Sequence, residues 1–458
     1  MTSGTRSTHA SDAHAMFADL SREHGFEPLR IEGQLPDELR GTLFRCGPAL
    51  RTCQGHPYKH LFDGDGAIAA IRFDGRAAHG AVRVVETPGL VAERAAGKAL
   101  YPAYGTLPPG PPRPLPKPKH AANISVHASP DRVLALHEAG APIELTHDLV
   151  TVGENDLGEP SIRQAFSAHP HWVAARGAYY NVGVEYGPRT KLALYELRGA
   201  AARKLGTVDL DGPTMIHDVA VTERHFIAFA PPLRLDLRAF ATGLVSYSDA
   251  LQWRPEVGTE VIVIPINDPT ALTRFTVDAF FQWHIAAAHE RGTEIVVNLV
   301  RYADFSCNRW IGALPTGAET PHTPGLLTRA TIDPARRTAR LSPINDVSLE
   351  FPIASTVDPR TIYALAHSSN SPASPFDRIV SVDMVSGNTR DVDLPRGQFP
   401  SEAIHVPGTD RGWLLSLIYD TASHTSHVAV IDARSLVVVA RAWFDHHIPF
   451  TLHGTWLV

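Results

Sequence analysis

Residues 410–431 read DRGWLLSLIYDTASHTSHVAVI, which is two apolar runs separated by a polar segment. The first run covers residues 413–418 and follows the turn signal Asp410-Arg411-Gly412, and the second covers residues 427–431. Short apolar runs bounded by turn residues predict two antiparallel strands of a hairpin. The same pattern recurs throughout the chain, for example at residues 133–136, 226–229, 261–264 and 295–300.

This recurring pattern predicts an all-β fold. Many short strands spread over more than 400 residues favour a β-propeller, although no repeat of fixed length is visible in the sequence. We expect one propeller domain with cap loops at residues 26–458. Residues 1–25 contain no such apolar run, and we expect them to form a mobile N-terminal tail.

Two segments depart from the pattern. Residues 106–119 (TLPPGPPRPLPKPK) are rich in proline and predict an extended loop across one face of the propeller, with a linker or a partner-docking segment as the alternative. Residues 233–251 predict a helix that packs on the core, or else a cap that touches a membrane or lines a tunnel. The apolar side chains at helical spacing in this segment are Leu233, Leu237, Phe240, Leu244 and Leu251.

Composition excludes several classes of protein. The chain of 458 residues has a net charge of −6 and a pI near 6.5, and this charge balance does not indicate binding to nucleic acid. The cysteines Cys46, Cys53 and Cys307 are odd in number and scattered, which argues against a disulfide framework and against a cysteine-based metal site. No run has the length of a signal peptide core or a membrane span, so we expect a cytoplasmic protein, with peripheral membrane contact left open.

Four histidines have distinctive local contexts. They are His169 in AHPH, His217 in MIHD, His284 in FQWH and His453 in LHG. Their wide separation excludes one helix or one hairpin, but the inner strands of a propeller converge on its axis and can bring them together. Four neutral imidazoles around one point would bind a divalent transition metal, and this set suggests iron and oxygen chemistry.

Several ordered motifs give the chain a likeness to a known family. Residues 41–48 (GTLFRCGP) followed by 60–66 (HLFDGDG) resemble the N-terminal signature of the carotenoid cleavage oxygenases. Residues 122–123 leading into 134–140 (LALHEAG), residues 253–259 and the four histidine contexts are similar to that family as well. The resemblance runs in order from about residue 30 to the C-terminus.

The resemblance implies a seven-bladed propeller with one non-haem Fe(II) per chain on its axis, held by the four histidines. It also implies three supporting glutamates: Glu138 for His217, Glu350 for His284 and Glu402 for His453, with no glutamate for His169. A carboxylate that accepts the other N–H of a metal-bound imidazole fixes the tautomer and the ring angle. The implied reaction is dioxygenase cleavage of a C=C bond in a hydrophobic polyene, a carotenoid or apocarotenoid, to give two carbonyl products.

Bulky side chains near the ligands are expected to shape a substrate tunnel. They are Trp283, Met215, Phe450, Ile124, His137 and Tyr101. Ile124 stands where many family members have threonine. His137 stands where carotenoid-cleaving members often have tryptophan and stilbene-cleaving members have lysine, so we favour a carotenoid or apocarotenoid, while Tyr101 and Tyr104 remain able to hold a hydroxyl group.

Other functions remain open on the sequence alone. The first alternative is cleavage of a phenolic stilbene or phenylpropene, and a retinoid isomerohydrolase is a more remote one. A non-catalytic propeller that serves as a binding scaffold, or a zinc hydrolase, would also fit the fold class. We expect His171 and His289 to lie outside the ligand set, and residues 62–66 (FDGDG) to form a structural turn and not a calcium loop.

Overall fold

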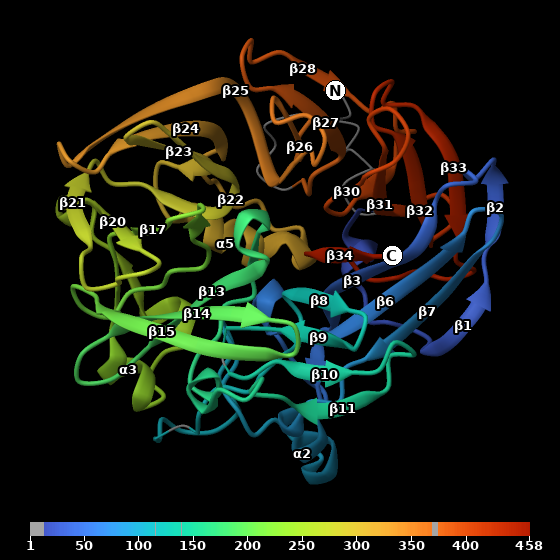
Figure 1. Cartoon of the computed structure of the whole chain (residues 1–458). Coiled ribbons are helices and arrows are strands. Elements are labelled where there is room, and N and C mark those ends of the chain that lie inside the picture. The colour runs from blue at the N-terminus through green and yellow to red at the C-terminus, as the bar shows by residue number, and fades with distance from the viewer. Residues whose placement is uncertain (1–12, 115, 139, 369–373) are drawn as a thin grey trace, which may run out of the picture.

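The computed structural model describes residues 13–114, 116–138, 140–368 and 374–458. Figure 1 shows antiparallel sheets arranged around a central axis. Residues 410–431 form the predicted hairpin, with β31 (Trp413–Asp420) paired to β32 (Thr425–Asp432) and Ile418 opposite His427. The other four apolar runs are also strands, so the prediction of an all-β fold is confirmed.

The described chain forms a seven-bladed β-propeller, as predicted. Blade 1 contains β34 (Gly454–Leu457), β3 (Arg40–Leu50), β6 (Asp65–Asp74), β7 (Ala78–Val84) and β1 (His24–Pro28). Blade 2 contains β8 (Ser125–Ser129), β9 (Arg132–Leu136), β10 (Ile143–Leu145) and β11 (Thr151–Glu154). Blade 3 contains β12 (His171–Val173), β13 (Ala178–Glu185), β14 (Lys191–Arg198) and β15 (Ala201–Asp209).

The remaining blades continue around the axis. Blade 4 contains β16 (Ala220–Val221), β17 (His225–Ala230), β20 (Thr259–Pro265) and β21 (Thr273–Val277). Blade 5 contains β22 (Phe281–Arg291), β23 (Glu294–Tyr302), β24 (Leu326–Asp333) and the first part of β25 (Thr338–Ala354). Blade 6 contains the rest of β25 with β26 (Thr361–Ala366), β27 (Arg378–Asp383) and β28 (Thr389–Asp391). Blade 7 contains β29 (Gln398–Pro400), β30 (Ile404–Val406), β31, β32, β33 (Val438–Trp443) and β2 (Arg30–Gly33).

Both ends of the chain close the ring. The C-terminal strand β34 pairs with β3 and becomes the innermost strand of blade 1, where it reaches the centre of the molecule in Figure 1. The N-terminal strand β2 pairs with β33 and forms the outer edge of blade 7. Blades 1 and 7 therefore each contain strands from opposite ends of the sequence.

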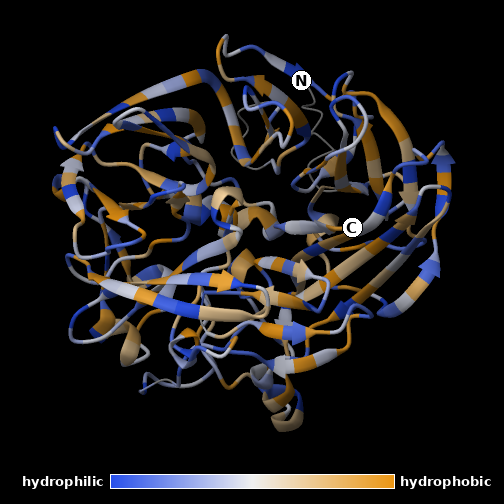
Figure 2. Cartoon of the chain, in the orientation of Figure 1, coloured by the Kyte–Doolittle hydropathy of each residue, from blue (hydrophilic) through white to orange (hydrophobic). Residues whose placement is uncertain are grey.

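The hydrophobic core lies mainly between neighbouring blades. Hydrophobic and hydrophilic residues interleave along the strands in Figure 2, as expected when both faces of a blade pack on other blades and its outer edge meets water. One cluster of buried side chains joins blades 1 and 7, for example Leu43 with Val430, and another joins blades 3 and 4, for example Tyr180 with Phe226. Burial between blades fixes the radial arrangement that the site requires.

Residues 233–251 do not form the single helix that their spacing predicts. Leu233 and Leu251 belong to a two-stranded hairpin, β18 (Leu233–Leu235) with β19 (Leu251–Trp253), and two short helices, α3 (Leu237–Ala241) and α4 (Tyr247–Ala250), lie between these strands. Asp236 begins α3 by accepting a hydrogen bond from the Ala239 N–H at 2.9 Å. Gly243, at a φ of 70°, follows the end of α3. A stripe at helical spacing is therefore also compatible with short helices inside a hairpin.

Further helical elements lie in the connections. They are α2 (Pro88–Ala96), α5 (Ser306–Ala313) and the 3₁₀ turns η1 (His14–Phe17), η2 (Leu61–Asp63), η3 (Pro160–Arg163), η4 (Ala174–Arg176), η5 (Pro255–Val257) and η6 (Leu314–Thr316). A small hairpin joins β4 (Thr52–Cys53) to β5 (His56–Pro57). Among the described residues, no helix is long and apolar enough to cross a membrane. The described part of residues 106–119 forms neither helix nor strand.

The predicted mobile tail is only partly described. Residues 1–12 lie outside the described residues. From His14 onward the chain packs on the propeller: Met16 and Phe17 are 1% and 3% exposed, and the Phe450 N–H donates to the Met16 carbonyl. The start of the described chain therefore packs on the core through its apolar side chains, and the expectation of a mobile tail stays a prediction.

Candidate metal centre

The four histidines of the sequence pattern lie together on the propeller axis. One ring nitrogen from each lies within 4.8 Å of those of the other three. The Nε2 atoms of His169 and His217 are 2.9 Å apart, and those of His284 and His453 are 3.0 Å apart. Metal–imidazole bonds of about 2.1 Å place adjacent ligand nitrogens about 3 Å apart, so this spacing fits one ion held by all four rings.

Every blade contributes one residue to this centre. His453 immediately precedes β34 of blade 1, His169 and His217 come shortly before β12 and β16 of blades 3 and 4, and His284 lies in β22 of blade 5. The three glutamates come from blades 2, 6 and 7: Glu138 follows β9, Glu350 lies in β25, and Glu402 lies between β29 and β30. The seven blades thus bring seven distant segments of the sequence to one point.

Local backbone irregularities aim two of these side chains. The pairing of β22 with β23 shifts register on both sides of Ile285, next to His284. The pairing of β25 with β26 shifts register between Glu350 and Ile353, and Phe351 has a φ of 54°. Bulges re-aim side chains relative to a regular strand, and they are frequent beside functional sites. Here they turn His284 and Glu350 toward each other.

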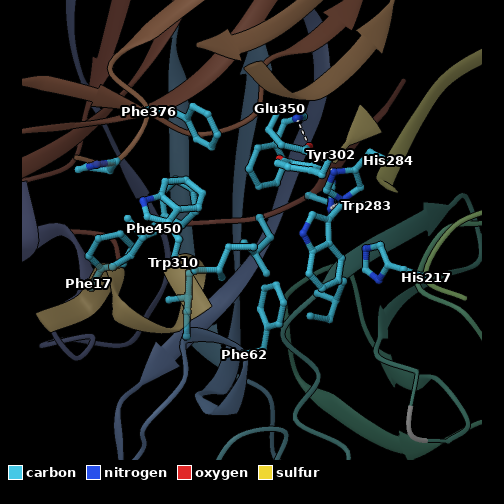
Figure 3. Close-up of a pocket in the computed structure, with 18 residues that line it drawn as sticks. Phe17, Phe62, His217, Trp283, His284, Tyr302, Trp310, Glu350, Phe376 and Phe450 are labelled. Atoms are coloured by element: carbon cyan, nitrogen blue, oxygen red, sulfur yellow. Dashed lines mark hydrogen bonds and ion pairs between the residues drawn. The ribbon is translucent and has the colours of Figure 1, made fainter. Parts of the chain in front are cut away.

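Three imidazole–carboxylate pairs surround the four nitrogens. Glu138 Oε1 lies 2.7 Å from His217 Nδ1, and Glu402 Oε1 lies 2.8 Å from His453 Nδ1. Glu350 Oε2 lies 2.5 Å from His284 Nδ1, as the dashed line in Figure 3 indicates. When each carboxylate accepts the Nδ1–H, the lone pair of Nε2 faces the centre. For His169, no described carboxylate lies within 4 Å.

The protonation of two of the rings suits metal binding. Burial lowers the pKa of His169 and His453 well below the usual value, and the neighbouring imidazoles lower it further. Both rings are therefore neutral near pH 7, which is the form that donates a lone pair. Burial would raise the pKa of Glu138, but the attraction of His217 outweighs it and lowers that pKa to about 2. The carboxylate of Glu138 is thus ionised.

Two further residues organise the site and were not identified from the sequence. Arg45 is fully buried; it donates to Glu402 Oε2 at 3.0 Å and to the Leu452 carbonyl at 2.9 Å. Asp218 lies 2.7 Å from His171 Nε2 and accepts from the Ile285 N–H at 2.8 Å, which ties the segment after His217 to the strand that carries His284. Both residues lie within motifs that carry the family resemblance. Their position in these motifs was the only feature of the sequence that could have identified them as site residues.

Two other histidines, which we expect to lie outside the ligand set, are not part of the histidine cluster. His171 pairs with Asp218 and is not one of the four clustered histidines, and His289 is exposed on β22. Residues 62–66 run from the end of η2 into the start of β6, and Asp63 accepts hydrogen bonds from the His60 and Gly105 N–H groups. Gly66 is required there, because a Cβ at this position would lie 2.0 Å from the Ala122 carbonyl oxygen.

A narrow apolar pocket lies directly against the centre. Its volume is about 40 Å³, and its wall includes His217, His284 and His453. Figure 3 shows aromatic rings around it, with Trp283 between Phe62 and His217. The ring of Trp283 lies 5.0 Å from that of His217 and perpendicular to it. Apolar walls of this kind keep water away from the ligands.

A much larger cavity approaches the centre from the side of Glu138. Its volume is about 720 Å³, and it shares Phe62 with the narrow pocket. Residues of the cap and of the proline-rich loop form much of its wall, among them Leu237, Phe240 and Tyr247. This size is typical of pockets that enclose small organic ligands.

The expected tunnel residues divide between the two spaces. Trp283, Phe450 and Ile124 line the narrow pocket, whereas Met215 and His137 line the large cavity, together with Tyr104. Tyr101 lines neither of these two spaces, and its backbone N–H donates to Glu93 beyond the cavity wall. The inclusion of Tyr101 is therefore not supported by the geometry, since nearness in sequence to Tyr104 does not place both side chains on one wall.

Comparison with known proteins agrees with this architecture. The family model described as retinal pigment epithelial membrane protein matches residues 17–458. The chain belongs to this carotenoid oxygenase family. The resemblance found in the sequence motifs is thereby confirmed.

Members of the carotenoid oxygenase family are similar to this chain over most of its length. An apocarotenoid-15,15'-oxygenase from Synechocystis is 32% identical over 93% of this chain and 92% of its own. The crystal structure of cobalt-substituted Synechocystis ACO superimposes with a TM-score of 0.89 and 30% identity, covering 98% of both chains. An isoeugenol monooxygenase from Pseudomonas putida is 28% identical over 63% of this chain and 60% of its own.

Proposed function

We propose that this chain is a non-haem Fe(II) dioxygenase that cleaves a C=C bond of a carotenoid or apocarotenoid and gives two carbonyl products. The observation that carries the proposal is the convergence of four imidazole nitrogens beside a large, mostly apolar cavity. The similarity to an apocarotenoid-15,15'-oxygenase supports the same reaction class.

The donor set favours iron over other metals. Three Nε2 lone pairs face the centre, and two pairs of ring nitrogens approach to 2.9 and 3.0 Å. His284 and His453 both have Nδ1 beside a carboxylate, so their 3.0 Å contact joins two Nε2 lone pairs and is repulsive unless a cation lies between them. No thiolate is present among the four ligands, and catalytic zinc usually has three protein ligands, so a set of four histidines argues against a zinc hydrolase. Bound Fe(II) would supply the activation of dioxygen for cleavage of the double bond.

The residues of the chain would bind, orient and protect the reactants. Glu138, Glu350 and Glu402 hold three of the rings by Nδ1, which fixes the direction of each Nε2. Phe62 borders both spaces and packs edge-on against Trp283 of the narrow pocket, and the two rings would exclude water from the centre. The large cavity would hold the polyene chain, and its volume of about 720 Å³ accommodates such an elongated molecule.

A second candidate function is cleavage of a phenolic stilbene or phenylpropene. Three tyrosine hydroxyls lie along the large cavity, and those of Tyr186 and Tyr247 are 2.7 Å apart. Tyr104 donates to Asn308 Oδ1 at 2.9 Å. These groups could orient a phenol, and the similarity to an isoeugenol monooxygenase favours the same reading. A binding scaffold without activity receives no comparable support.

The proposed place of action is the cytoplasm, with peripheral contact to a membrane that stores the apolar substrate. Leu244, on the cap between α3 and α4, is 61% exposed. An exposed leucine beside residues that line the cavity would let the cap touch an apolar phase. The net charge of −6 argues against nucleic acid as a partner.

The test compares two histidines of the same strand. His284→Ala removes one ligand, and His289→Ala removes an exposed ring on β22. We expect the first variant to lose iron and activity while retaining its fold, and the second to keep both. Iron is measured by elemental analysis after anaerobic purification. Products are measured by mass after aerobic incubation with an apocarotenal and with resveratrol in parallel.

The products decide between the two candidate functions. Aldehydes from the apocarotenal alone support the first proposal, and cleavage of resveratrol alone supports the second. Near-normal turnover by the His284→Ala variant contradicts the assignment of the metal ligands. Stoichiometric zinc without iron in the active protein contradicts the proposed cofactor.

A further inference from the structure

The proline-rich loop places a lysine at the large cavity. Lys117 lies between Pro116 and Pro118, and all three residues line the cavity. Its Nζ donates to the Arg163 backbone carbonyl at 2.8 Å, and it would lie 3.5 Å from a Cβ built on Gly140. The side chain is exposed, so Lys117 stands where the cavity opens to solvent. The adjacent prolines restrict the backbone on both sides of it.

The other cations of the cavity wall already have carboxylate partners. Lys119 is buried and lies 2.8 Å from Asp65 and 2.7 Å from Glu93. Arg163 lies 2.8 Å from Asp156. By contrast, Lys117 has no carboxylate within 4 Å among the residues that the structure describes, and a carbonyl oxygen satisfies only one of its three N–H donors.

The acidic side chains of the cavity are also paired. Glu138 pairs with His217, and Glu185 lies 2.6 Å from Lys204. Partial desolvation by the surrounding residues lowers the pKa of Lys117 below its usual value, and the attraction of the more distant Glu154 offsets only part of this effect. The cavity therefore combines a mostly apolar wall with one ammonium group that has no carboxylate within 4 Å among the described residues.

We propose that Lys117 binds the carboxylate end of an elongated unsaturated substrate whose hydrocarbon chain enters the large cavity toward the four histidines. The inference rests on the proposed function and narrows it to a polyenoic acid. An ammonium group attracts a carboxylate more strongly than it attracts a neutral aldehyde or alcohol. The hydrocarbon chain would pass Leu237 and Phe240, where apolar burial contributes most of the affinity.

Anaerobic binding separates this inference from the proposed reaction. Iron-loaded protein is titrated without oxygen, with a polyenoic acid and with the aldehyde of equal length, and the change in polyene absorbance gives Kd. We expect Lys117→Gln to weaken binding of the acid about five-fold and binding of the aldehyde at most about twofold. Lys117→Arg should restore most of the affinity for the acid. Lys98→Gln, which removes an exposed lysine outside the cavity wall, is the matched control.

Salt provides an independent readout. Raising the ionic strength should weaken binding of the acid to the natural protein and leave the Lys117→Gln variant nearly unaffected, because screening acts on the charge pair. Equal losses for acid and aldehyde in Lys117→Gln would overturn the inference, as would an unchanged Kd for the acid. Preference for a phenolate over the acid would also overturn it. Failure of turnover with normal acid binding would instead contradict the proposed function.

Discussion

Two imidazole–carboxylate pairs of this centre have nearly equal nitrogen–oxygen distances in different surroundings. The distance from nitrogen to oxygen is 2.8 Å for His453 with Glu402 and 2.7 Å for His217 with Glu138. The side chain of Glu402 is 5% exposed and also contacts the fully buried Arg45. The side chain of Glu138 is 37% exposed and faces the large cavity.

The difference shows that one chemical motif serves two purposes in this fold. Glu402 lies where blades 1 and 7 meet, and through Arg45 it is tied to the strand that receives the C-terminal β34. We therefore expect this sealed pair to stabilise ring closure as well as to orient a ligand. Among the described residues, no arginine or lysine forms an ion pair with Glu138, so we expect the open pair to act on the metal alone.

The largest effect is expected from breaking the sealed pair. Arg45→Met leaves the buried carboxylate of Glu402 without its cation, and loss of one partner of a buried ion pair typically costs about 3–5 kcal/mol. We expect the free energy of unfolding of the metal-free protein to fall by that amount, measured by urea denaturation. Arg189→Met, at an arginine whose side chain is 80% exposed, should change it by less than about 0.5 kcal/mol.

A double variant tests the cause of this loss. Arg45→Met combined with Glu402→Gln leaves no buried charge, so it should be more stable than Arg45→Met alone. If the two substitutions destabilise additively, Arg45 acts through packing and not through its charge.

A smaller effect is expected at the open pair. Glu138→Gln keeps the shape of the side chain but weakens its hold on His217 Nδ1, and loss of such a supporting carboxylate typically costs about 10–100-fold in metal affinity. We expect iron affinity to fall within this range while urea stability of the metal-free protein stays nearly constant. Competition with a chelator measures the first quantity.

The matched variant is Glu185→Gln, at another carboxylate of the same cavity that contacts Lys204 and no ligand. Its iron affinity should equal that of the natural protein. A large loss of folding stability in Glu138→Gln would remove the distinction between the sealed and the open pair.

The sequence predicted what is local or repeated along the chain. Alternating apolar runs gave the strands, because a blade buries side chains by the same period-2 rule everywhere. The cap was harder: Leu233 and Leu251 fit a helical stripe, yet both are in strands, since a short apolar spacing is compatible with either structure. The packing of Met16 was also missed, because a four-residue turn has no periodicity to detect.

The candidate site was predictable only through motif likeness. The spacing of the histidines excluded a local site, but the pairing of three of the rings with glutamates came from the resemblance. The contact between Arg45 and Glu402 joins residues 357 positions apart, and no local pattern encodes it. Such contacts follow from ring closure, which the order of the strands determines only once the fold is formed.

The smallest expected effect is a dependence of folding stability on pH. It tests whether blade 7, which carries the buried Glu402 pair, is closed to water. His427 in β32 of blade 7 is fully buried, with neither ring nitrogen hydrogen-bonded, and burial lowers its pKa to about 3. An unfolded histidine titrates near 6.5, so below that pH the unfolded state takes up a proton that the folded state excludes, and stability falls.

Between pH 7.5 and 5.5 this single ring should cost about 1.4 kcal/mol of folding stability, and none above pH 7.5, where both states are neutral. His427→Leu, which places an apolar side chain of similar size against Trp443, should remove that part of the pH dependence. Urea denaturation of the metal-free protein at the two pH values measures it, because bound metal would add its own proton linkage. If the natural protein and the variant lose equal folding stability between the two pH values, blade 7 opens enough in the folded state to let the His427 ring ionise. The contact between blades 1 and 7 would then not be closed to water.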